Sequence, residues 1–153
     1  MYLENSKTII VKIGSSLIID DKKIVRKKWL LEFAKDIKAL RKKNKNIIIV
    51  SSGAIALGCK KLNITKKKLK IDQSQAVASV GQIELMNLFK KIFAIQKINI
   101  SQILLTLEDT EIRRRAINAK RTIENLFSLN FIPIVNENDT IATSEIKYGD
   151  NDR

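Results

Sequence analysis

Short apolar runs alternate with longer amphipathic segments along this chain. Four runs rich in isoleucine, leucine and valine have the length of buried strands: 8–13, 47–50, 103–107 and 131–135. Between them, apolar residues recur three and four positions apart, as on one face of a helix, over 24–42, 72–95 and 109–126. This alternation predicts an α/β fold, a three-layer αβα sandwich around a mainly parallel sheet.

Three local patterns refine this prediction. Asp72 followed by Gln75 has the spacing of a capping box that opens the second helix. Pro133 cannot donate a ladder hydrogen bond, which predicts an edge strand or a bulge for the last run. Beyond it, 140–143 and 145–148 alternate in polarity and predict a short hairpin.

Composition excludes several classes of protein. No apolar run approaches the ~20 residues of a membrane helix, and the first residues do not resemble a secretory signal. The single cysteine, Cys59, excludes an internal disulfide, and the lack of histidine excludes His-based catalysis and zinc sites built on histidine. We therefore expect a cytoplasmic protein that has no membrane partner.

The net charge of +13 suggests nucleic-acid binding at first sight. The lysines, however, are scattered over nearly the whole chain, and aromatic residues make up only 5% of it. No stretch interleaves basic and aromatic residues in the way that stacking on bases requires. Nucleic acid is therefore not the partner that we expect.

Small polar residues follow the first two predicted strands. Gly14-Ser15-Ser16 ends one and Ser51-Ser52-Gly53 ends the other, and such turns present backbone N–H groups to anions. Ordinary turn chemistry at strand–helix junctions explains the same residues equally well. Lys12, inside an otherwise apolar strand, is costly to bury unless it meets an anion, so it is a candidate for binding a transferring phosphoryl group.

Two acidic and amide-rich clusters lie near the end of the chain, at 136–139 and 149–152. The first follows an apolar strand directly, and ligands of open parallel sheets bind at that end of the strands. Asn, Asp and Gly are also common turn residues, so a single cluster would favour a turn. Two such clusters, closely spaced and rich in carboxylate, favour a ligand site.

These motifs together resemble the amino acid kinase family, in particular its members that phosphorylate glutamate. The matching segments occur in the expected order over nearly the whole chain, at 11–16, 50–58, 75–82, 102–106, 136–139 and 149–152. The resemblance implies ATP-dependent phosphorylation of the side-chain carboxylate of L-glutamate, with Mg²⁺ as the metal cofactor. It also implies that proline is a feedback inhibitor that binds near 143–147. Full-length members of the family are expected to be homo-oligomers.

The resemblance also implies roles for individual residues. Lys12 would be catalytic and would contact the ATP phosphates, above a turn shaped by Gly14 and Ser15. Asp152 would orient the cationic groups around the reaction centre. The residues that would bind glutamate are Ser52, Gly53, Ala54, Asp139, Asp150 and Asn151.

The chain departs from the family pattern in length. The resemblance implies that residues 1–153 correspond to the N-terminal, glutamate-binding part of the kinase domain, and we expect the ATP-binding half and a C-terminal RNA-modification-type domain to be absent from them. We expect this segment alone to be marginally stable or oligomeric, and barely active. Two alternatives stay open: a non-catalytic remnant or regulatory module that binds glutamate or proline, and another family member acting on acetylglutamate, aspartate or a nucleotide.

One geometric requirement decides whether the proposed site can exist. Lys12 must lie at the same rim of the sheet as Asp139 and Asn151, with space between for an amino acid and a nucleotide phosphate tail.

Overall fold

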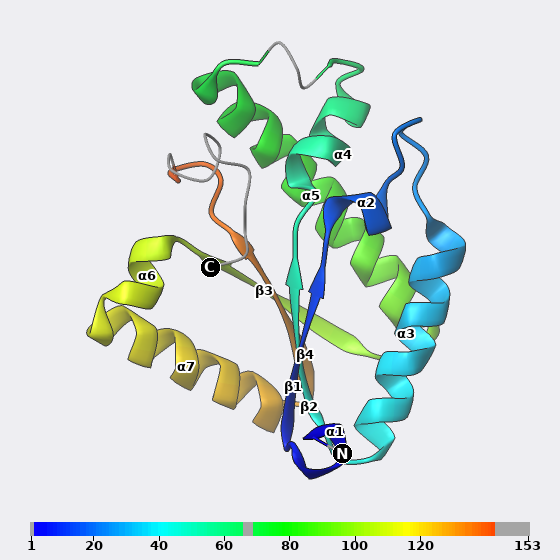
Figure 1. The fold of residues 1–153 in the computed structure, drawn as a ribbon, viewed down its shortest axis with the longest axis vertical. Coiled ribbons are helices and arrows are strands. Elements are labelled where there is room, and N and C mark those ends of the chain that lie inside the picture. Colours follow the sequence, from blue (N-terminus) through cyan, green and yellow to red (C-terminus); the bar gives the residue numbers. More distant parts are fainter. Residues whose placement is uncertain (1, 66–68, 143–153) are drawn as a thin grey trace.

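Four parallel strands form the centre of the protein. The computed structural model describes residues 2–65 and 69–142, and in it the strand order is β1-β2-β4-β3 (Figure 1). The strands are β1 (Thr8–Ile13), β2 (Asn46–Ser51), β3 (Asn99–Leu105) and β4 (Phe131–Glu137).

Helices cover both faces of this sheet, which confirms the predicted three-layer α/β fold. In Figure 1, α3 and α5 lie on one side of the sheet and α6 and α7 on the other. The helices are α1 (Tyr2–Asn5), α2 (Ser15–Ile18), α3 (Lys27–Lys42), α4 (Ala54–Lys61), α5 (Ile71–Ile95), α6 (Leu107–Glu111) and α7 (Arg113–Ser128).

The hydrophobic core lies between the sheet and the α3–α5 layer. Leu30 and Ile37 of α3, Leu85 and Phe89 of α5, and Ile49 of β2 are all buried in one cluster. These residues follow the predicted helix spacing, because the face that meets the sheet must be apolar. A chain of aromatic contacts, Trp29 stacked on Phe33 and Phe33 edge-on to Phe93, joins α3 to α5.

The backbones of α4 and α5 touch at two glycines. A Cβ atom on Gly81 would lie 1.7 Å from the carbonyl oxygen of Ala54, and one on Gly58 would lie 2.1 Å from the carbonyl oxygen of Val77. No side chain larger than hydrogen fits at either position. The contact fixes α5 against the first turn of α4.

The second layer is packed less closely. Every residue of α7 is described and none of them is buried. A cavity of about 570 Å³ lies beneath it, lined among others by Thr8 of β1, Ile48 of β2, and Ile123 and Phe127 of α7.

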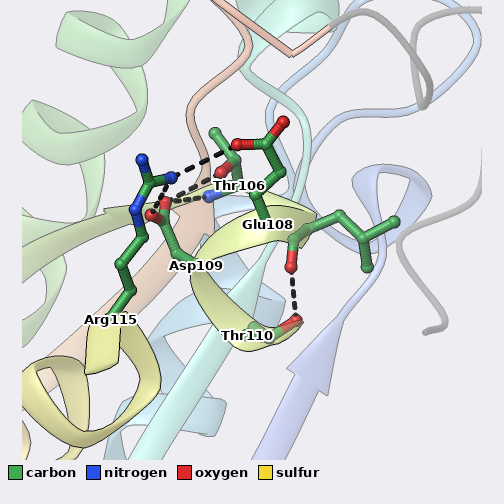
Figure 2. A network of polar contacts seen from close by, with 6 residues as sticks. Thr106, Glu108, Asp109, Thr110 and Arg115 are labelled. Atoms are coloured by element: carbon green, nitrogen blue, oxygen red, sulfur yellow. Dashed lines mark hydrogen bonds and ion pairs between the residues drawn. The ribbon is translucent and has the colours of Figure 1, made fainter. Parts of the chain in front are cut away.

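A polar network fixes the junction between α6 and α7 (Figure 2). The Asp109 Oδ2 atom accepts hydrogen bonds from the backbone N–H of Thr106 at 2.7 Å and from its hydroxyl at 2.9 Å. Arg115 Nη1 lies 3.3 Å from the nearer carboxylate oxygens of Glu108 and Asp109. The predicted single helix from Asp109 is therefore two helices, with the break at Ile112.

Two predictions about strands were wrong. Pro133 does not lie at an edge or a bulge, because β4 is a central strand between β2 and β3. The β2–β4 ladder pairs only Ile49 with Ile134 and Val50 with Val135, so the proline falls just before it. The third strand begins at Asn99 rather than 103 and ends at Leu105, because Thr106 caps α6.

The predicted capping box was also misplaced. The second long helix begins at Ile71, and Gln73 accepts a hydrogen bond from the backbone N–H of Lys70 at 3.0 Å. Gln75, which was expected in that box, instead donates to the carbonyl oxygen of Ala142 at 3.3 Å. The predicted hairpin at 140–148 lies mostly outside the described residues.

Candidate functional site

The carboxyl ends of all four strands meet at one rim of the sheet, because every pairing is parallel. Lys12 is the penultimate residue of β1, the Ser52–Gly53–Ala54 turn follows β2, and Asp139 follows β4 by two residues. Lys12 and Asp139 therefore lie at the same rim of the sheet, which is the first part of the requirement. Asn151 lies outside the described residues. In open parallel sheets this rim is where ligands bind.

The two glycine–serine turns at this rim are in contact. The Ser52 backbone N–H donates to the carbonyl oxygen of Ile13 at 3.2 Å, and the Ser52 hydroxyl donates to the same oxygen at 3.4 Å. A Cβ atom on Gly53 would lie 3.6 Å from the Cα of Ser15. Residues 14–15 and 52–53, separated in sequence, thus form one continuous backbone surface.

Backbone conformation explains the glycine at the second turn. Gly53 has a φ of 105°, which a side chain would strain, and it directly precedes α4. Gly14 has an ordinary extended conformation, with a φ of −70°, and a Cβ atom there would meet only open space and Ser16 Oγ at 4.0 Å. Only the second glycine is therefore required by its backbone conformation.

Lys12 is exposed, so the predicted cost of burying it does not arise. The strand register aligns Lys12 with Val50, and Val50 with Val135, so these three side chains share one face of the sheet. Glu137 lies two residues beyond Val135 and therefore projects from that same face. An acidic and a basic residue thus share this face at the rim, two strands apart.

The Glu137 carboxylate is an unusual feature of this rim. Both of its oxygens are buried, and neither has a hydrogen-bond partner within the part of the chain that the structure describes. No local pattern singles out this residue within the 136–139 cluster. A buried carboxylate requires a positive charge or a proton, which makes Glu137 a functional candidate.

Asn136 projects to the opposite face of β4, toward α5. It is 3% exposed, and its Nδ2 donates to the Gln82 Oε1 at 2.7 Å. The following segment folds back on itself, since the Asn138 carbonyl oxygen accepts hydrogen bonds from the backbone N–H groups of Ile141 at 3.1 Å and Ala142 at 3.0 Å. Sequence reasoning assigned no role to Gln82, because nothing local distinguishes it from other helix residues.

Three predicted site residues cannot be placed. Asp150, Asn151 and Asp152 lie outside the described residues, as does the 143–147 loop expected to bind proline. The described part of the predicted site therefore consists of Lys12, the 14–15 and 52–54 turns, and Asp139.

Comparison with known proteins gives this rim a context. The model of the amino acid kinase family matches residues 7–153. The chain belongs to the amino acid kinase family.

Relatives in the amino acid kinase family include close sequence matches. The chain is 78% identical over 153 residues to a protein of Pelagibacter ubique (strain HTCC1062) named glutamate 5-kinase, covering 100% of this chain and 42% of that protein. It is 49% identical over 152 residues to a glutamate 5-kinase of Ruegeria sp. (strain TM1040), covering 99% of this chain and 41% of that protein. The chain thus spans about two fifths of the length of these curated relatives.

A solved structure of low sequence identity has the same fold. Carbamate kinase from Giardia lamblia, solved bound to AMP-PNP, superposes with a TM-score of 0.55 at 11% identity, over 91% of this chain and 63% of that chain.

Among the helices of the described residues, none is long and apolar enough to cross a membrane.

Proposed function

We propose that the protein containing these residues catalyses ATP-dependent phosphorylation of the side-chain carboxylate of L-glutamate, which yields L-glutamyl 5-phosphate for proline biosynthesis. The observation that supports it most directly is the meeting of Lys12, the two contacting turns and Asp139 at one rim. The substrate is inferred from the relatives named glutamate 5-kinase. The nucleotide is inferred from the kinase family.

Lys12 contacts the ATP phosphates in this proposal. Its ammonium stabilises the charge that spreads over the transferring phosphoryl group, while Gly14 and Ser15 shape the turn beneath the phosphates. The glutamate carboxylate is already a nucleophile, so the site needs no general base. Positioning and charge neutralisation supply the catalysis.

Glutamate lies on the neighbouring turn. The Ser52 hydroxyl and the backbone of Gly53 and Ala54 hold its carboxylates, and Asp139 holds its α-ammonium. Asp150 and Asn151 complete glutamate binding, and Asp152 orients the cationic groups at the reaction centre.

The described residues also suit Mg²⁺ that arrives with the nucleotide. No trio of acidic, cysteine or histidine side chains within them could hold a metal ion without other ligands. Mg²⁺ in kinases is bound by one or two carboxylates together with substrate phosphates, so this rim need not supply a complete set. Glu137, whose buried carboxylate has no hydrogen-bond partner among the described residues, is the residue that would hold it. When bound, the ion neutralises phosphate charge.

Residues 1–153 form the glutamate-binding part of the kinase domain in this proposal. The remaining length, by which the relatives exceed this chain, supplies most of the ATP pocket. Proline acts as a feedback inhibitor near 143–147, the protein is a homo-oligomer, and it works in the cytoplasm, where ATP and glutamate are available.

The test is glutamate-dependent ADP release by the full-length protein, with trapping of the acyl phosphate by hydroxylamine. We expect Lys12→Met to lower kcat by about 10²- to 10³-fold. Lys7→Met is the matched control, because Lys7 is exposed and precedes β1 at the opposite rim. Turnover of acetylglutamate, aspartate or a nucleotide but not glutamate would refute the substrate. Glutamate binding by calorimetry without any ATP binding would instead identify a regulatory module.

A further inference from the structure

We propose that Gln82 is a specificity-determining residue that donates a hydrogen bond from Nε2 to a carboxylate oxygen of the bound amino acid. This inference rests on the proposed function and extends it to Gln82, which lies in the 75–82 segment of the resemblance but had no role of its own. It follows from where α5 places Gln82, how Asn136 orients it, and which of its atoms has no partner.

The position of Gln82 is set by its neighbour, Gly81. The backbone of Gly81 packs directly on the carbonyl oxygen of Ala54 and the N–H of Gly58. The backbone of Gln82 therefore lies beside the first turn of α4, which directly follows Ser52 and Gly53. Its side chain reaches the end of β4, three residues before Asp139. The side chain of Gln82 thus links α5 to the segment that leads to Asp139.

The orientation of the Gln82 amide is set by Asn136. The Asn136 side chain is buried, and its Nδ2 lies 2.7 Å from the Gln82 Oε1. Because the amide group is planar, holding Oε1 also fixes the direction of Nε2. The Gln82 Nε2 is buried and has no hydrogen-bond partner among the described residues.

The chemistry of this atom restricts its ligand. An amide nitrogen only donates hydrogen bonds, so its partner must be an acceptor, such as a carboxylate oxygen, and not an ammonium group. A buried donor left without a partner is unfavourable, whereas a donor facing a carboxylate forms one of the stronger hydrogen bonds. Glutamate carries two carboxylates, and a residue that binds either of them would favour dicarboxylic substrates.

The face of α5 that carries Gln82 lies along the 136–142 segment for two helical turns. Gln75, seven residues before Gln82, donates to the carbonyl oxygen of Ala142 at 3.3 Å. Residues seven apart lie on one side of a helix, about 10 Å apart. The two hydrogen bonds therefore hold the 136–142 segment along α5, with Gln82 at the end nearest the 52–54 turn.

The experiment measures KM and kcat of the full-length protein for glutamate and for ATP. Gln82→Glu keeps an acceptor oxygen for Asn136 but places negative charge where the amide donated. We expect it to raise the KM for glutamate by about 10- to 100-fold, with the KM for ATP within about twofold of wild type. Gln82→Met, of similar volume, is expected to raise the same KM by about 10-fold.

Gln73→Glu is the matched control, because it makes the same charge change on the same helix. Its side-chain oxygen accepts from the Lys70 backbone N–H, which a carboxylate also does, so its kinetics should match wild type. A thermal melt of each variant shows whether it folds. If Gln82→Glu does not fold, the KM of Gln82→Met for glutamate tests the inference.

Three results would overturn the inference. An unchanged KM for glutamate in both Gln82 variants would leave the proposed function intact and refute the role of Gln82. A lower melting temperature and kcat with unchanged KM would make Gln82 a purely structural residue. A wild-type protein that neither binds nor phosphorylates glutamate would refute the proposed function and this inference together.

Discussion

Substituting Gly81 by alanine tests how the helices position the candidate site. The added Cβ would lie 1.7 Å from the Ala54 carbonyl oxygen, whereas separations under 3.0 Å are essentially never observed for Cβ atoms. The backbones of α4 and α5 would therefore have to separate by at least 3.0 − 1.7 = 1.3 Å. No side-chain rotation can relieve the overlap, because both contacting atoms, the Ala54 oxygen and the Gly58 nitrogen, belong to the backbone.

Two opposing free-energy terms decide the size of the effect. Alanine is favoured over glycine in a helix by about 1 kcal/mol. Overpacking a core costs about 1–3 kcal/mol, and an overlap between backbones belongs at or above the upper end of that range. We therefore expect Gly81→Ala to lower the free energy of unfolding by about 2 kcal/mol or more, which corresponds to about 4–8 °C in Tm for a domain of 150–250 residues.

The assay is thermal or urea unfolding of the full-length protein, followed by glutamate kinetics. The KM for glutamate should also rise, because the Gly53–Ala54 turn must move with α4. Gly14→Ala is the matched control for stability, since a Cβ atom there meets nothing closer than 4.0 Å and the φ of Gly14 suits alanine. Equal Tm values for Gly81→Ala and wild type would refute the reasoning.

Two further predictions concern the α6–α7 layer and the isolated segment. Hydrogen bonds from the Thr106 backbone N–H and hydroxyl, aided by Arg115, hold the pKa of Asp109 below its usual 3.8. These bonds therefore stabilise the folded protein above that pH, and this stabilisation is lost as the pH falls through the lowered pKa. Thr106→Val should therefore destabilise the protein at pH 7, and this deficit should shrink as the pH falls below 3.8 and Asp109 becomes protonated. A deficit that stays constant in urea melts over a series of falling pH values would contradict this. Residues 1–153 expressed alone should bind a hydrophobic dye and self-associate, because Ile10 is 66% exposed on the edge strand β1. A segment that sediments as a monomer and unfolds cooperatively would contradict this prediction.

Local sequence patterns predicted most elements of the fold. The second strand and the buried residues of α3 and α5 followed from apolar spacing, because they pack in the same core. The first strand was predicted at the right place, but it is only partly buried, since Ile10 and Lys12 are exposed. The pattern failed at β3, where Asn99, Ser101 and Gln102 interrupt the apolar run. That strand lies at the edge of the sheet, where polar residues are tolerated.

The position of Pro133 could not be derived from its chemistry alone. A proline in a central strand is tolerated here because the ladder to β2 begins only at Ile134. The length of a ladder depends on how strands distant in sequence twist past one another, which no local pattern records.

The candidate site was predictable in part. Lys12, Ser52 and Asp139 stand next to strand ends, and parallel topology alone brings such residues to one rim. The pairing of Gln82 with Asn136 joins positions 54 residues apart, and a glutamine inside a long helix carries no signal of its own. What distinguishes Gln82 is its buried Nε2 atom, which has no hydrogen-bond partner among the described residues.

The strand order has a consequence for how the chain assembles during synthesis. Among the described strands, β4 is the last in sequence, yet it lies between β2 and β3. While the polypeptide leaves the ribosome, β1 and β2 can associate early, but β3 has no neighbour until Phe131–Glu137 has been made. The nascent protein must therefore keep an open slot between β2 and β3 until β4 has been made, and chaperones that shield exposed strand edges would act during that interval.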